Sequence, residues 1–518
     1  MDRLLGRREV LGALGAGAVG TLAGRGLGGA GRAVGGLAEL GGRGGAPTSA
    51  GLAPLASRAT TATGQVQRFL SRPDLQPAAV QLVTALPGQA PGLVLMDSHA
   101  GPGQQGPLLL DSSGQVVWFN PLSAGATPAL RAFNVSLQQY GGRPVLAWFQ
   151  GAVVDAHGQG HYVLVDKSYR TVAKVFGANG LQGDLHEFFV TPRGSAIFTC
   201  YGTQEADLSH LGGPRHGAYF YGVVQEVDIA TGKLLWQWRS DQHVPLSDSY
   251  APLGSHMTVP WDYLHINSVS VDGAGDFLIS ARNTWCVYKV SRATGAVLWR
   301  MGGKRSQFRF GPDAQFAWQH HVVAHAGGLV SIFDNGSGDY VTEPQSRGIV
   351  LRVNEKARTA DLVLQFTHPG QPVRAGALGS VQLLPDGHVF VGWGAEAAFT
   401  EYDSKGRPVL DGRLAGHGIE SYRAFRSQWQ GSPPDVPAVA LRSAGNGTEV
   451  AVSWNGATAV DHWVVMGGSS TGSLSALGQA PRRGFETLIS VPQRHTYLAV
   501  QAVGRDGRLL GRSRAVRA

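Results

Sequence analysis

The chain has 518 residues, too many for one compact core, so we expect two or three structural units. Only 15% of the residues are charged, whereas glycine (74) and tryptophan (12) are frequent; this excludes a disordered chain and favours short strands joined by glycine turns. The net charge of +8 is spread along the chain beyond its N-terminal part, which argues weakly for an anionic partner and against a nucleic acid.

The first 30 residues have the pattern of an export signal. Arg7 and Arg8 form a twin arginine, and a weak apolar run follows and ends near Gly24, as in Tat-type signals. The run is shorter than the roughly 20 apolar residues of a membrane span; a signal anchor and a chance basic tail are the alternatives. We expect an exported protein, extracellular or in the cell envelope, with residues 31–64 as a flexible Gly/Ala-rich linker and no further membrane span.

From residue 65 to 430 two kinds of hairpin alternate. One has a D-S-[SK]-G or D/S-x-x-[TS]-G turn and an aromatic end, as in "LLLDSSGQVVWFN" (108–120) and "QEVDIATGKLLWQW" (225–238). The other begins at a histidine or glycine, as in "HEFFVTPRGSAIFTCY" (186–201). Two such hairpins make four strands, which is the size of a propeller blade. The pattern predicts an all-β fold, a β-propeller of about six blades over 65–430.

The rhythm changes after the proline-rich segment "SQWQGSPPDVPAVA" at 427–440. Residues 438–518 contain four strand-like runs, among them "TEVAVSWNG" and "HTYLAVQAVGRDGRLLGRS". They predict a small β-sandwich that is similar to a fibronectin type III module, with the tryptophan of "VSW" in its core. The two cysteines, Cys200 and Cys286, exclude a disulfide framework and a four-cysteine zinc site; we favour buried free thiols over one disulfide.

Three histidines occupy the entry to successive hairpins of the second kind: His186, His265 and His320. Because the first strand of each blade lines the central channel, we expect these side chains to converge. Three histidines suggest a metal, but Arg282, at the end of the next strand after His265, would repel a cation and would bind an anion such as sulfate or phosphate. Asn267 lies on the same strand face as His265 and adds a donor. Taken singly, each histidine could instead be structural.

Several short stretches, in this order, resemble the arylsulfotransferase family of bacterial six-bladed propeller enzymes. These stretches are "FLSRPDLQPAAV", "DLHEFFVT", "DYLHINSV", "ISARN", "VLWRMGGKRSQF", "WQHHV", "IFDNG", "LPDGHVFVGWG" and "TEYDSKG". The resemblance covers about residues 65–430. It implies transfer of a sulfuryl group from an aryl sulfate ester to a phenol, without a nucleotide donor, a cofactor or a metal, so that the partners are small molecules.

The resemblance also implies roles for individual residues. His320 attacks the sulfur and is transiently sulfated, while His186, His265 and Arg282 stabilise the sulfuryl oxygens, with Asn267 in support. Either His186 or His265 exchanges the proton with the phenol.

Two further residues are candidates for substrate binding. His321 stands where an aspartate usually follows the nucleophile in this family, and alternation along a strand turns its side chain away from that of His320. Lys304, in "MGGKRSQF", is either an ordinary basic loop residue or a contact for an anionic donor at the channel mouth.

Two other functions compete with sulfuryl transfer. A propeller without catalytic activity could bind an anionic or glycan ligand at the cell surface. A metal-dependent hydrolase is the weaker alternative, because Arg282 opposes a cation. The motif "GSSTG" at 468–472 matches a hydrolase pattern, but no helix is expected after it, so we interpret it as a turn. The sequence leaves the donor, the acceptor and the oligomeric state open.

Overall fold

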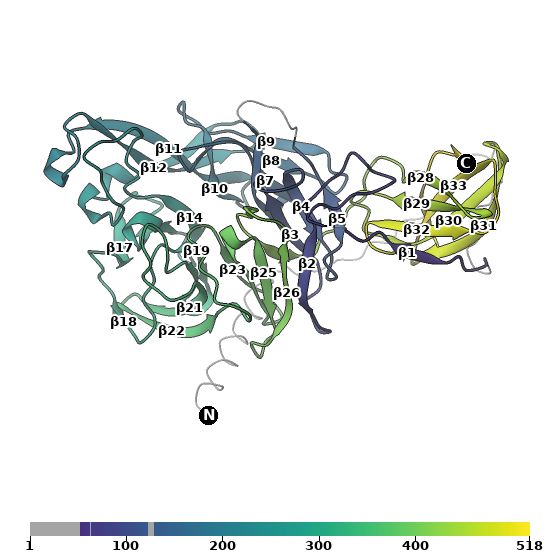
Figure 1. The fold of residues 1–518 in the computed structure, drawn as a ribbon. Helices are drawn as coiled ribbons and strands as arrows, with labels where there is room; N and C mark the ends of the chain where they lie inside the picture. Colours follow the sequence, from purple (N-terminus) through teal and green to yellow (C-terminus); the bar gives the residue numbers. More distant parts are fainter. Residues whose placement is uncertain (1–51, 63, 123–128) are drawn as a thin grey trace, which may run out of the picture.

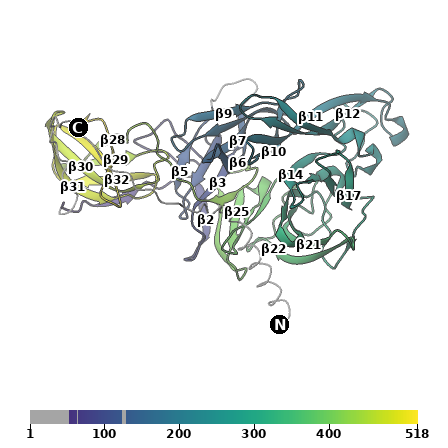
Figure 2. The same ribbon diagram turned by 180° about the vertical axis from the view of Figure 1, so that it is seen from behind.

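The computed structural model describes residues 52–62, 64–122 and 129–518. Over these ranges the protein is built of strands, with a few 3-10 turns between them. Figures 1 and 2 show a larger unit, coloured purple to green, and a smaller yellow unit that lies beside β5. The predicted signal over 1–30 and most of the predicted linker lie outside the described residues.

The larger unit consists of sheets in which consecutive strands are neighbours. One sheet has the order β27 (Phe425–Ser427), β3 (Leu93–Ser98), β4 (Gly106–Leu110), β5 (Val116–Phe119). The next combines β6 (Arg131–Tyr140), β7 (Arg143–Val154), β8 (His157–Val165), β9 (Thr171–Val175), β10 (Gly183–Val190), β11 (Ser195–Ala206), β12 (Gly217–Asp228), β13 (Leu234–Arg239). The first of these sheets takes β27 from the far end of the unit, which closes the ring of sheets.

Three further sheets continue the same pattern. One contains β14 (Ile266–Val271), β15 (Phe277–Ala281), β16 (Cys286–Val290), β17 (Val297–Gly302). Another contains β18 (Arg309–Phe310), β19 (His320–His325), β20 (Leu329–Asp334), β21 (Arg347–Asn354), β22 (Thr359–Phe366). The last contains β2 (Val80–Ala85), β23 (Ser380–Leu383), β24 (Val389–Gly392), β25 (Ala398–Tyr402), β26 (Pro408–Leu414).

The hairpins follow from the chemistry of their turns. Between β4 and β5, Asp111 Oδ1 accepts the backbone N–H groups of Ser113 and Gln115, and Gly114 has a φ of 73°. A carboxylate that closes such a turn and a glycine that adopts positive φ without a steric cost together reverse the chain in a few residues. The same Asp–Gly arrangement recurs at Asp272 and Gly275.

The strands β6, β10, β14, β19, β23 and β27 line one central cavity of about 520 Å³. Sheets of consecutive strands that place their first strands around a central channel, with the last sheet closed by both ends of the unit, form a β-propeller. Hydrophobic side chains of neighbouring sheets pack together between them, for example Ile279 with Trp238. The all-β and propeller predictions are therefore confirmed, while the number of six blades stays a prediction.

The smaller unit contains two sheets that share a core including Trp454 and Trp463. One sheet contains β1 (Ser57–Ala59), β28 (Ala438–Ala444), β29 (Gly447–Ser453), β32 (Glu486–Val491). The other contains β30 (Val460–Ser470), β31 (Ser473–Pro481), β33 (Tyr497–Gly504), β34 (Leu509–Arg512), β35 (Val516–Arg517). The strand β1 was not predicted, because it lies within the stretch interpreted as a flexible linker. The fibronectin type III assignment stays a prediction.

The short 3-10 turns connect strands of the larger unit: η1 (Ser209–Leu211), η2 (Ser240–Gln242), η3 (Leu246–Asp248), η4 (Arg282–Thr284), η5 (Ala326–Gly328), η6 (Gly394–Glu396). Cys200 and Cys286 are buried free thiols, as the sequence predicted. In the part of the chain that the structure describes, no helix has the length and apolar character to cross a membrane.

Candidate functional site

His186 lies in β10, where the pairing with β11 is irregular between Gly183 and Phe188. Its Nδ1 is 2.6 Å from Asp184 Oδ2, and its side chain is buried. Asp184 also accepts hydrogen bonds from the Gly158 N–H (2.6 Å) and the Thr199 hydroxyl (2.9 Å). Burial would raise the pKa of this carboxyl, but the charge of His186 and the donors around it lower the pKa to about 2. The ionised carboxylate therefore holds the proton of His186 on Nδ1.

His265 directly precedes β14 and has a φ of 56°, which is rare for a residue with a side chain. Its Nδ1 contacts Asp262 Oδ2, and its ring centroid is 4.6 Å from that of His186. Burial, only partly offset by Asp262, lowers the pKa of His265 to about 4. The ring is therefore neutral near pH 7, with Nδ1 protonated toward Asp262 and Nε2 carrying a lone pair.

His320 is the first residue of β19. Two residues near it, Trp318 and His321, have positive φ angles. Its Nδ1 lies 2.7 Å from Asn335 Oδ1. The Asn335 amide nitrogen donates to the carbonyl oxygens of Ala375 and Leu378, which orients Oδ1 toward His320. Nδ1 of His320 therefore carries the proton.

The other nitrogen of His320, Nε2, accepts the backbone N–H of Leu378 at 3.2 Å. Burial and the nearby charge of Arg282 hold the pKa of His320 well below its ordinary value. Asn267, two residues after His265, donates to the carbonyl of Gln319, the residue before His320, so His265 and the adjacent His186 lie on the strands next to His320. His320 is thus a neutral imidazole whose basic nitrogen is Nε2.

Arg282 opens η4 at the end of β15. Its Nη1 donates to Asn283 Oδ1 (2.7 Å) and its Nη2 to the Gly376 carbonyl (3.3 Å). Its Nε is buried without a hydrogen-bond partner. Burial lowers the pKa of Arg282 from its ordinary value, yet a guanidinium stays charged near pH 7. A positive group with a spare donor beside His320 can bind an anion.

Flat aromatic side chains surround Arg282. The guanidinium lies 4.8 Å from the ring of Trp318. The ring centroids of Trp285 and Trp318 are 5.3 Å apart, and Trp285 stacks on Tyr250 with centroids 3.8 Å apart. Tyr340 contacts both tryptophans. Tyr340 is 43% exposed. These rings offer a surface on which another aromatic ring can pack.

Three of the predicted substrate-binding residues lie elsewhere or are engaged within the protein. Asn267 donates its amide N–H to the Gln319 carbonyl at 2.6 Å, which joins β14 to β19 behind the histidines. Lys304 donates to the carbonyl oxygens of Ser249 and Ser247. His321 accepts the Val381 N–H through Nδ1 and lines the central cavity rather than the surroundings of His320. The side chain of His321 thus points away from that of His320, as expected, but the cause is the positive φ of His321 and the register shift after His320 rather than regular strand alternation.

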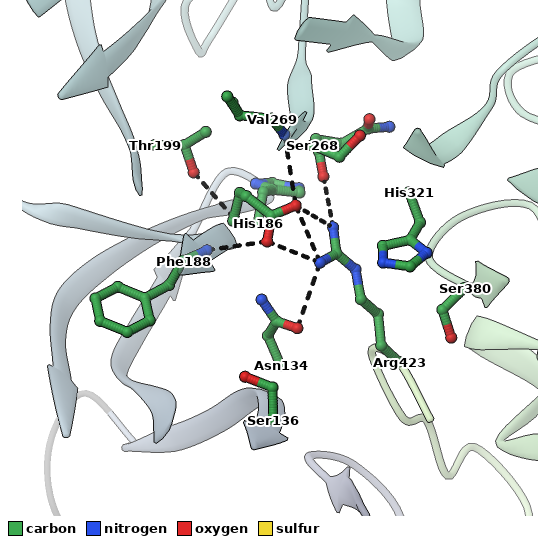
Figure 3. A network of polar contacts seen from close by, with 12 residues as sticks. Asn134, Ser136, His186, Phe188, Thr199, Ser268, Val269, His321, Ser380 and Arg423 are labelled. Atoms are coloured by element: carbon green, nitrogen blue, oxygen red, sulfur yellow. Dashed lines mark hydrogen bonds and ion pairs between the residues drawn. The ribbon is translucent and has the colours of Figure 1, made fainter. Parts of the chain in front are cut away.

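A buried ion pair lies in the wall of the central cavity, and Figure 3 shows its arginine, Arg423, between His186 and His321. Arg423 Nη1 is 3.0 Å from Glu187 Oε1, and its Nη2 donates to the Asn267 carbonyl at 3.0 Å. The neighbouring Tyr422 donates its hydroxyl to the carbonyl oxygen of His186. These contacts connect the backbones of β10, β14 and the segment before β27, which fixes the relative positions of the three strands.

The structure thus brings His186, His265, His320 and Arg282 together, as the register of the hairpins predicted; their chemical roles stay predictions. No role was predicted for Asp184, Asp262 or Asn335. A signal was present for all three, since they lie within "DLHEFFVT", "DYLHINSV" and "IFDNG". Nor was a role predicted for His157, whose Nε2 is 3.3 Å from Asp262 Oδ2.

A metal ion is the other group that such residues could hold. In the described ranges of the chain, His157, Asp262 and His265 each offer one ligand atom, and these atoms lie within 4.8 Å of one another. The same atoms already contact one another as an acid and its two imidazoles. Both ring nitrogens of His157 and Asp262 Oδ1 are buried without a hydrogen-bond partner, so an analysis of bound metal in the purified protein decides between a cation and an ion pair at this cluster.

Comparisons with known proteins give one family. The family model described as Arylsulfotransferase (ASST) matches residues 136–415, which is more than half of the chain and includes all four converging side chains. No protein of the curated set matches this chain.

Several solved structures are similar in shape. A protein of unknown function from Bacteroides caccae aligns with a TM-score of 0.38 and 12% identity, over 64% of this chain and 98% of that one. The periplasmic gluconolactonase of Pseudomonas aeruginosa aligns with a TM-score of 0.36 and 13% identity, over 82% of this chain and 96% of that one. Virginiamycin B lyase from Staphylococcus aureus aligns with a TM-score of 0.30 and 8% identity, over 72% of this chain and 94% of that one. TM-scores this low assign neither a fold nor a function to this chain.

Proposed function

The chain belongs to the arylsulfotransferase family, and from this premise we propose that it transfers a sulfuryl group from an aryl sulfate ester to a phenol through a sulfated His320. The proposal also includes export by the N-terminal segment. The observation that carries the proposal is the difference between the partners of the three histidines. His186 and His265 each contact a carboxylate, whereas His320 contacts the neutral amide of Asn335.

That difference suits two chemical tasks. A carboxylate on Nδ1 stabilises an imidazolium, so that His186 or His265 can accept and return a proton. A neutral amide holds the Nδ1–H of His320 without favouring protonation of Nε2, and the charge of Arg282 disfavours it further. The basic nitrogen of His320 is therefore free to act as a nucleophile near pH 7.

In the first step, Nε2 of His320 attacks the sulfur of the donor. The N–S bond forms as the bond from sulfur to the aryl oxygen breaks, and the contact between Nε2 and the Leu378 N–H is given up. The leaving phenolate keeps the bonding electron pair and either departs as such or takes a proton from His186, because the neutral His265 has no proton on Nε2 to give. The positive charge and the unpaired Nε of Arg282 stabilise the charge that spreads over the sulfuryl oxygens.

In the second step, the oxygen of an acceptor phenol attacks the same sulfur. Its proton passes to His186 or His265, the S–N bond breaks, and the electron pair returns to Nε2 of His320. The rings of Trp285 and Tyr340, which lie beside Trp318 and Arg282, support an aromatic group on the donor or the acceptor.

The first experiment measures nitrophenol release from 4-nitrophenyl sulfate by the full-length chain, with and without phenol. We expect release that depends on phenol and is lost in His320→Asn. His325→Asn, at the other end of β19, is the matched control and should keep its activity. A mass gain of one sulfuryl group on wild-type protein incubated with donor alone, absent in His320→Asn, would locate the intermediate.

Other results would lead to other functions. Release without phenol would show that water is the acceptor and that the protein is a sulfatase. Wild-type protein that is folded but inactive toward a panel of aryl sulfates would contradict the proposal and favour a binding propeller without catalytic activity.

A further inference from the structure

His157, the first residue of β8, lies against the site although it is not one of the predicted residues. Its side chain is 4% exposed, and its ring centroid is 5.5 Å from that of His265. On its other side the ring packs on Tyr201 (4.0 Å) and Phe220 (4.5 Å). Neither ring nitrogen of His157 has a hydrogen-bond partner, so the burial of this imidazole is offset only by the charge of an ion-pair partner.

The partner of His157 is the carboxylate that also holds His265. Asp262 Oδ2 lies 3.3 Å from Nε2 of His157, and the same oxygen contacts Nδ1 of His265. The next residue, Gly158, donates its N–H to Asp184, the carboxylate that holds His186. A side chain at Gly158 would clash, since a Cβ there would lie 2.4 Å from the backbone nitrogen of Leu185. The start of β8 therefore contacts both carboxylates of the site.

We propose that His157 is a positioning residue for sulfuryl transfer: by holding Asp262 it sets the ring orientation and the tautomer of His265. The inference rests on the proposed function, and it adds a residue that acts through Asp262 rather than on the substrate. Without His157, the Asp262 side chain, which is 23% exposed, can rotate toward solvent, and His265 loses its fixed acceptor.

The charges agree with this arrangement. Burial would lower the pKa of His157, but Asp262 raises it above its ordinary value, and the pKa of Asp262 is held well below its own. These directions are the ones expected for an imidazole beside a carboxylate, and the neutral His265 donates Nδ1–H to the same carboxylate.

The test compares His157→Phe with His157→Gln in the full-length protein. Phenylalanine keeps the packing on Tyr201 and Phe220 but has no donor, whereas glutamine keeps a donor for Asp262. We expect His157→Phe to lower kcat by on the order of 10- to 100-fold, the loss typical when a residue that orients a functional histidine is removed, with little change in KM. His157→Gln should recover most of that loss.

A double-mutant cycle tests whether the effect passes through Asp262. If it does, His157→Phe lowers kcat no further in the Asp262→Asn background. Additive losses would overturn the proposal, as would wild-type activity in His157→Phe or failure of His157→Gln to recover. A stoichiometric metal ion in the purified wild-type protein, detected by elemental mass spectrometry, would also overturn it, because His157 would then be a ligand.

A readout that needs no activity separates this proposal from the proposed function. The Nδ1–H of His265, bonded to a carboxylate, should give a low-field proton NMR signal, assigned by its loss in His265→Gln. We expect the signal to shift or broaden in His157→Phe and to persist in His157→Gln. An unchanged signal in His157→Phe overturns the inference even if the enzyme has no activity toward aryl sulfates.

Discussion

Each of the three converging histidines has its Nδ1 on an oxygen acceptor. The acceptors are Asp184 for His186, Asp262 for His265 and Asn335 for His320. Because Nδ1 is occupied in all three rings, the chemistry is left to Nε2 of each. The identity of the acceptor, carboxylate or amide, then decides whether a ring suits proton transfer or nucleophilic attack.

Arg282 permits a test of how the sulfuryl oxygens are stabilised. Arg282→Lys keeps a positive charge but loses the planar fork of donors, including the unpaired Nε. We expect kcat for nitrophenol release to fall by roughly 10²- to 10³-fold, the usual cost of one oxyanion donor. Arg309→Lys, on an exposed residue of β18, is the matched control. Equal activities of the two variants would show that charge alone is sufficient.

Asp184 predicts a dependence of stability on pH. Its folded-state pKa of about 2 lies below its ordinary value of 3.8, so its contribution is fully present above pH 3.8 and is lost as the pH falls toward 2. Relative to Asp184→Asn, the wild type should lose about 2 kcal/mol of its advantage in that interval. Urea unfolding at about pH 6 and about pH 3 measures the part lost by pH 3, which is about half of the total, roughly 1 kcal/mol. A difference that is independent of pH would contradict the prediction.

At the level of elements, the site depends on how strands of different sheets are held around the channel. Asn267 joins β14 to β19, and Arg423 joins the segment before β27 to β10 and β14. Their side chains make these contacts within the protein, and the contacts hold together the strands that carry or follow His265, His186 and His320. Their effect on activity is therefore expected to come through stability and placement.

The buried Arg423–Glu187 ion pair allows a test of how contacts between strands contribute to stability. Arg423→Met leaves Glu187 buried without its partner, which typically costs about 3–5 kcal/mol in the free energy of unfolding. The double variant with Glu187→Gln as well should be more stable than Arg423→Met alone, because no uncompensated charge remains. Denaturant unfolding measures both. If the double variant is the less stable one, the ion pair is not what makes the single change costly.

At the scale of the whole molecule, the propeller and the sandwich are connected by specific contacts. Asn455 of the sandwich exchanges two hydrogen bonds with the backbone of Phe119, and Tyr169 donates to the Gly456 carbonyl. In addition, β1, which precedes the propeller in sequence, pairs with β32 of the sandwich. The sandwich is thus completed by chain segments from both sides of the propeller.

This pairing predicts that a protein starting at residue 65 is less stable than one starting at residue 52. The shorter protein lacks β1 and leaves the edge of β32 unpaired. A loss of about 1 kcal/mol would lower the thermal midpoint of a domain of this size by roughly 4–8 °C. Calorimetry on both proteins measures the shift. Identical thermograms would show that β1 contributes nothing to the sandwich.

The sequence by itself determined the hairpins, the propeller and the convergence of the histidines. Turn signals such as Asp111 with Gly114 act within a few residues, and the repeat of hairpins then places His186, His265 and His320 at equivalent positions around a channel. Such information is local, and repetition extends it to the whole unit.

Only the tertiary structure decided which atoms meet. The Leu378 N–H reaches His320 across 58 positions of the chain, and His157 reaches Asp262 from another sheet. The amide of Asn267 donates to the backbone carbonyl of Gln319. The strand β1, which lies in a glycine-rich stretch, pairs with β32 of the sandwich. These contacts depend on how neighbouring sheets pack and twist against one another, and no short stretch of sequence contains both partners.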